Sequence, residues 1–131
     1  MTRDEGTQDR WQRHDWWGVV LDTDDVAVLA RFYAELRGWT IWRMDATGAA
    51  LDVGEGVAYL AVQLEPDYVR PVWPAAPGQQ QMMLHLDFEV TDLAAETARA
   101  VALGATLAQE QPQENVRVLL DPAGHPFCLY T

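Results

Sequence analysis

The side chains best suited to chemistry alternate along residues 84–90. His85, Asp87 and Glu89 take every second position there, and apolar residues take the positions between them. Successive side chains of a strand point to opposite faces, so the pattern predicts a strand with one polar and one apolar face. An imidazole on such a face can carry a proton or bind a metal ion. One imidazole does not hold a metal by itself, and an ordinary hydrogen-bonded histidine is an equally good interpretation of His85.

Gln63 and Cys128 repeat this arrangement on two further expected strands, because apolar residues flank each of them. The alternation predicts that both side chains share the polar kind of face with His85. Cys128 could act with His85 as a nucleophile and base, or as half of a zinc site. A buried cysteine that packs as a small hydrophobe is the more common case.

Tryptophan and charge indicate which ligand such a face would bind. Among the six Trp, Trp39, Trp42 and Trp73 are candidates to line a pocket for a planar molecule, of which we favour Trp42 and Trp73, while core packing is at least as good an interpretation of Trp39 and Trp42. The net charge of −11 comes from twenty acidic residues against nine basic ones, all arginine. That balance repels phosphates, so we expect no nucleic-acid or membrane partner, and we expect a neutral or cationic small molecule instead.

The elements that position these residues follow from turn and capping signals. Asp25 and Gly38 bracket a helix over residues 26–36, and Asp92 and Gly104 bracket another over 93–103. The remaining periodic segments predict strands at 17–21, 40–44, 50–53, 57–65, 84–90, 106–108, 115–120 and 126–130. Residues 1–15 predict a flexible N-terminal arm anchored by Trp11.

A repeat organises these elements. Sliding the chain by 67 residues places Asp25 over Asp92 and Gly18 over His85. We therefore expect an α+β fold with two tandem β-α-β-β-β modules in one domain, 16–131. Module one is 16–65, a proline-rich linker is 66–81, and module two is 82–131. One cysteine, no signal peptide and no long apolar stretch predict a cytoplasmic protein.

Several strings in this order resemble the vicinal oxygen chelate superfamily, which contains the glyoxalases and bleomycin-resistance proteins. They are Phe32-Tyr33 with Leu36-Arg37-Gly38-Trp39, His85-Leu86-Asp87 with Asp92-Leu93, Leu103-Gly104-Ala105, and Asp121-Pro122-Ala123-Gly124-His125-Pro126-Phe127. The resemblance implies a curved, cup-like mixed sheet with helices on its outer face. It also implies metal-ligand positions at Gly18, Gln63, His85 and Cys128, of which only His85 is a ligand of the usual kind.

Three functions are compatible with this resemblance. We favour a protein that binds a small, planar or cationic molecule in the cup through Gln63, His85, Asp87, Cys128, Trp42 and Trp73. We expect no cofactor or metal and no glyoxalase I activity, because that reaction needs a metal and a carboxylate. The alternatives are a lyase or isomerase that uses His85 as its catalytic residue, with or without a divalent metal, and an accessory or regulatory protein with a vestigial site. The resemblance also implies a homodimer, and leaves open whether one chain or two form the cup.

Overall fold

The structure is a computed structural model that describes residues 9–131. A short 3-10 helix, η1 (Arg10–Gln12), comes before the first module. That module comprises β1 (Trp17–Thr23), α1 (Val26–Arg37), β2 (Thr40–Met44), β3 (Gly48–Asp52) and β4 (Ala58–Leu64). The second module comprises β5 (Leu86–Glu89), α2 (Leu93–Leu103), β6 (Thr106–Leu107), β7 (Val116–Leu120) and β8 (Pro126–Tyr130).

Each module forms one open, four-stranded mixed sheet. Sheet A has the strand order β1-β4-β3-β2, and sheet B has the equivalent order β5-β8-β7-β6. In both sheets the first strand pairs in parallel with the last, and the other pairings are antiparallel. The two modules therefore share one topology, which confirms the predicted α+β fold with a tandem repeat.

Both helices begin and end where their capping residues predict. The Asp25 carboxylate accepts a hydrogen bond from Val28 N at 3.2 Å, and Asp92 accepts one from Ala95 N at 3.0 Å. These bonds satisfy backbone donors that the first helical turn leaves free. Gly38 ends α1 with a φ of 69°, in the left-handed region that glycine adopts without steric cost.

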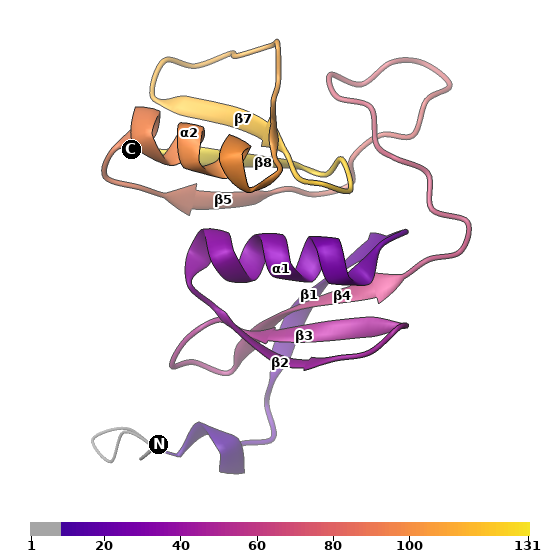
Figure 1. Cartoon of the computed structure of the whole chain (residues 1–131), viewed down its shortest axis with the longest axis vertical. Helices are drawn as coiled ribbons and strands as arrows, with labels where there is room; N and C mark the ends of the chain where they lie inside the picture. The colour runs from indigo at the N-terminus through magenta and orange to yellow at the C-terminus, as the bar shows by residue number, and fades with distance from the viewer. Residues whose placement is uncertain (1–8) are drawn as a thin grey trace.

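One hydrophobic core joins the two modules on the helix-covered sides of their sheets. Phe32 and Tyr33 of α1 lie 5.8 and 6.0 Å, between ring centroids, from Phe127 of sheet B. The other side of α1 packs on sheet A, against residues such as Leu51 and Leu60. Figure 1 shows α1 between sheet A and β5, with α2 alongside sheet B. The opposite face of each sheet, here called its outward face, therefore carries neither α1 nor α2.

Several strand boundaries differ from the predicted ones by one or two residues, including those of β5 and β3. The strand predicted at 84–90 forms only from Leu86 to Glu89, so His85 precedes it by one residue and Leu84 is 54% exposed. The register of Leu86 with Phe127 places Pro126 at the level of His85, and proline has no N–H to offer a neighbouring strand. The strand predicted at 50–53 lies at Gly48–Asp52 instead. Among residues 9–131, neither helix has the length and apolar character needed to cross a membrane.

Candidate functional site

His85, Asp87 and Cys128 come together on the outward face of sheet B. His85 Nε2 lies 3.2 Å from Asp87 Oδ1, and Asp87 is paired in register with Cys128 on β8. One potential ligand atom from each of the three lies within 4.8 Å of the others. Within residues 9–131 this is the one group of three or more His, Cys, Asp or Glu side chains that could share a metal ion.

The Cys128 thiol is held in its neutral form. Burial, and then the adjacent Asp87 carboxylate, raise the pKa of Cys128 to about 11. A thiol with this pKa is almost entirely protonated at pH 7, so it is a poor nucleophile. The three donors match the number of protein ligands in an open zinc site, but zinc binding would have to displace the thiol proton. The cluster can therefore donate hydrogen bonds and present negative charge as it stands.

Gln63 lies on the outward face of sheet A instead. It borders a pocket of about 610 Å³. The residues that line this pocket all lie between positions 20 and 64, and they include Val20, Trp42, Tyr59 and Ala61. Gly18 lies on the same face of β1, opposite Tyr59. The structure thus divides the predicted site residues into two sets, one on each sheet. Since both sheets turn their other faces to one shared core, the two outward faces do not form a common cup within this chain.

The N-terminal residues lie beside this pocket. Trp11 and Trp16 surround Trp42, with centroid distances of 5.0 and 5.6 Å. Arg10 Nη2 lies 2.5 Å from Asp52 Oδ2 on the outward face of β3. Figure 1 shows η1 on the side of sheet A opposite α1. The described part of the arm is therefore docked through Arg10 and the predicted anchor Trp11, which contacts both Trp16 and Trp42. Residues 1–8 lie outside the described residues.

The remaining predicted tryptophans lie elsewhere. Trp39 packs at the edge of the core, with its ring 5.9 Å from that of Phe88, as one of its two interpretations requires. Trp73 is in the linker, outside the residues that line the pocket at Gln63. Tyr59 was not among the predicted site residues, although its place two residues before Ala61 and four before Gln63 puts it on their face.

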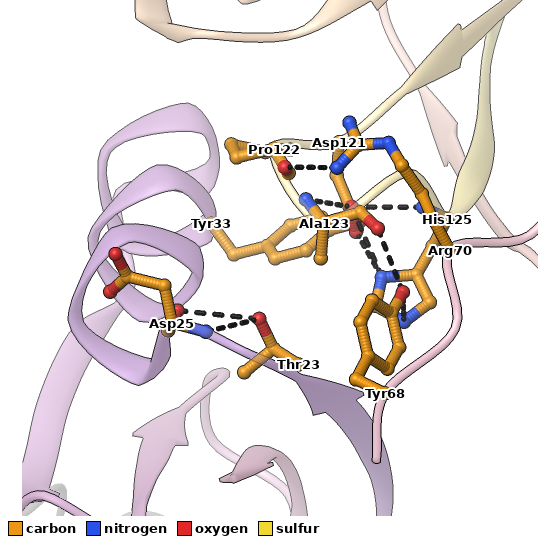
Figure 2. A network of polar contacts seen from close by, with 9 residues as sticks. All are labelled: Thr23, Asp25, Tyr33, Tyr68, Arg70, Asp121, Pro122, Ala123 and His125. Atoms are coloured by element: carbon orange, nitrogen blue, oxygen red, sulfur yellow. Dashed lines mark hydrogen bonds and ion pairs between the residues drawn. The ribbon is translucent and has the colours of Figure 1, made fainter. Parts of the chain in front are cut away.

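A buried polar network ties the modules together close to the linker (Figure 2). Tyr33 donates a hydrogen bond of 2.7 Å from its hydroxyl to Asp121 Oδ2, and both side chains are fully buried. His125 Nδ1 lies 2.8 Å from the same carboxylate oxygen, and His125 Nε2 lies 3.2 Å from the Tyr68 hydroxyl. Tyr68 donates to Ala123 O at 2.7 Å. His125 therefore closes the β7–β8 turn through its bonds to Asp121.

Comparison with known proteins identifies the family. The family sequence model of the glyoxalase-like domain matches residues 18–130, which include nearly all of both sheets and the helices α1 and α2. The chain belongs to this family. The search of curated proteins gave no match.

Solved structures share the fold of this glyoxalase-like domain. A glyoxalase/bleomycin resistance protein/dioxygenase family enzyme from Burkholderia phytofirmans PsJN is 22% identical, with a TM-score of 0.64 over 86% of this chain and 94% of its own. A glyoxalase-related enzyme from Fulvimarina pelagi is 21% identical, with a TM-score of 0.64 and coverages of 91% and 87%. A fosfomycin resistance protein from Mesorhizobium loti is 14% identical, with a TM-score of 0.62 and coverages of 92% and 93%.

Membership places the domain in the vicinal oxygen chelate superfamily, whose members often use a divalent metal. The four positions that the resemblance implies as ligands are occupied here by Gly18, Gln63, His85 and Cys128. The structure adds Asp87 to the two positions on sheet B and brings no carboxylate to Gln63 in the pocket on sheet A. The two halves of this implied ligand set therefore differ in chemistry, since only the half on sheet B has donors that suit a metal.

Proposed function

We propose that this glyoxalase-like domain binds a small, planar molecule on the outward face of sheet A and lacks glyoxalase I activity. The observation that carries the proposal is the pocket of about 610 Å³, bordered by Trp42 and Tyr59. Aromatic rings stack on planar ligands, and a pocket of this size lies within the range for small organic molecules. Gln63 is a neutral amide where a proton-shuttling carboxylate would be needed, so the face favours binding over proton transfer.

We also propose that the complete site prefers a cation and forms across a homodimer. Asp87 and Glu89 give sheet B an acidic outward face, which favours positive charge in a ligand. The two outward faces point away from one core, so a second copy is needed to bring sheet B to sheet A. Trp17, Met83 and Leu84 are 62%, 81% and 54% exposed, and contact with a second copy would cover apolar surface of this kind.

The binding test uses cationic, neutral and anionic forms of one aromatic scaffold. We expect the cation to quench tryptophan fluorescence at the lowest concentration, and the preference to fall in Asp87→Asn and His85→Ala and at higher salt. Glu110→Gln is the matched control, because it removes one exposed acidic charge from a loop elsewhere. Equal or absent quenching by all three compounds, unaltered in the variants, would rule out a cation-selective binding site.

The dimer is tested separately by light scattering at micromolar concentration. We expect a mass of two chains for the wild type and a shift toward one chain for Met83→Asp. Val101→Asp is the control, because Val101 is 44% exposed on α2, on the helix side. A wild-type monomer at that concentration would exclude the two-chain cup.

The cluster of His85, Asp87 and Cys128 favours a second candidate, a metal-dependent lyase or isomerase. On the first proposal, protein purified without added metal contains far less than one divalent ion per chain. Elemental analysis that finds about one ion per chain, lost in His85→Ala and retained in Glu110→Gln, would instead support the enzyme.

A further inference from the structure

The ring of Tyr59 takes up the space that a side chain at position 18 would need. Gly18 and Tyr59 are register partners on the parallel strands β1 and β4. A Cβ at Gly18 would lie 2.5 Å from Cδ2 and Cε2 of Tyr59 and 2.6 Å from its Cζ. Three ring atoms at nearly equal distance show that the ring leans across β1. With the ring in this position, only glycine fits at position 18.

This placement leaves the middle of the outward face open. Gly48 and Ala50 on β3 and Ala61 on β4 have small side chains and line the pocket. Trp42 borders it from β2, two strands from β4, which corresponds to about 10 Å between the strand axes. Because Tyr59 leans toward β1, away from Trp42, the two rings flank a floor of small residues, beside which Val20 and Arg43 also line the pocket.

Polar groups lie along the same strand at two ends of this floor. Tyr59 and Gln63 point to one face and are four residues apart, which places their Cα atoms about 13 Å apart. Neither side chain makes a hydrogen bond to another described residue. A molecule on the floor would therefore meet a free phenol at one end and a free amide toward the other.

We propose that Tyr59 determines the specificity of this face, and that its ligand is a planar, fused-ring aromatic compound with a hydrogen-bonding group at its edge. The ring of Tyr59 contacts the ligand, and its hydroxyl bonds to that group. Gly18 leaves room for this ring. At a position where the resemblance implies a metal ligand, the chain therefore accommodates the aromatic side chain of Tyr59 instead. This inference rests on the proposed binding function and names its ligand class.

The test measures the dissociation constants of 9-aminoacridine and acridine by calorimetry. Removal of the ring in Tyr59→Leu should weaken binding of both probes about twofold to tenfold, the usual range for an aromatic contact. Tyr59→Phe keeps the ring and removes the hydroxyl. It should weaken the binding of whichever probe forms a hydrogen bond to that hydroxyl about threefold. Gly18→Ala should resemble Tyr59→Leu, because its methyl group displaces the ring.

Two further variants control for folding. Gly56→Ala should leave affinity unchanged, since a Cβ there meets nothing within 4 Å. The double variant Gly18→Ala with Tyr59→Leu removes the clash, so its thermal stability should return toward that of Tyr59→Leu alone while affinity stays low.

The outcomes separate the two proposals. Wild-type affinity in Tyr59→Leu and Gly18→Ala would overturn the role of Tyr59 and leave small-molecule binding in place. Additive stability losses in the double variant would overturn the steric relation of the two residues. Failure of the wild type to bind either probe would overturn both proposals.

Discussion

The substitution Tyr33→Phe tests the bond that joins α1 to the β7–β8 turn. It removes one hydroxyl, whose 2.7 Å hydrogen bond to Asp121 Oδ2 is fully buried, and leaves the aromatic ring in the core. A hydrogen bond to a charged group contributes about 1.5–3 kcal/mol. The Asp121 carboxylate keeps its bonds from the backbone N–H groups of Ala123 and His125, at 2.9 and 3.0 Å. We therefore expect a loss near 2 kcal/mol.

Urea unfolding followed by tryptophan fluorescence measures this loss. For a domain of this length, about 2 kcal/mol corresponds to a fall in Tm of roughly 4–10 °C. Tyr59→Phe is the matched control, with an expected effect within about 0.5 kcal/mol, because its hydroxyl bonds to no described residue. A loss below about 0.5 kcal/mol in Tyr33→Phe would refute the reasoning that this bond holds the modules together.

The same variant has a signature in alkaline solution. Burial, followed by the charge of Asp121, raises the pKa of Tyr33 well above the ordinary value of 10.0. Below pH 10 the folded and unfolded chains both keep the phenol proton, so its full contribution to stability is present. Above pH 10 the unfolded chain loses this proton while the folded chain retains it, so stability falls. Tyr33→Phe should lose less stability than the wild type between pH 9.5 and 11.

Two further predictions concern single side chains. Cys128, with its pKa raised to about 11, should react slowly with iodoacetamide at pH 7.5 and faster as the pH rises. Asp87→Asn should accelerate the reaction at a given pH, because the Asp87 carboxylate raises the pKa of the thiol. Equal rates in the two proteins would show that Asp87 does not act on the thiol. Asp92→Ala should cost about 1 kcal/mol in urea unfolding through loss of the N-cap of α2, whereas Asp92→Asn should cost a few tenths, and equal costs would contradict a capping role.

The local structure could be predicted from the sequence because its signals are local. Asp25 and Asp92 cap their helices through backbone groups three residues later, and Gly38 and Gly104 end them, so both helix positions follow from residues close in the chain. Alternation placed Asp87 and Cys128 on one kind of face. It also extended the strand back to Leu84, because alternation carries no information on where the partner strand begins.

Contacts between distant elements could not be predicted in this way. Tyr33 and Asp121 are 88 residues apart, and nothing in the sequence around either names the other as a partner. From the sequence alone, Gly18 is only a position without a ligand side chain. The register of β1 with β4 places it beside Tyr59, whose ring occupies the space that a larger residue would need. The separation of Gln63 from the cluster on sheet B likewise depends on how the modules pack around α1.

That packing also explains how the fold persists while the site changes. The core lies on the helix-covered faces, where Tyr33, Leu51 and Phe127 are completely buried. Gly18, Gln63 and Cys128 project from the opposite faces, so their substitution removes little apolar contact from the core. A domain of this kind can therefore vary at these outward positions and remain folded. The chemistry of this chain accordingly has to be tested at the outward residues, Tyr59 and Asp87 first, since likeness of fold says little about them.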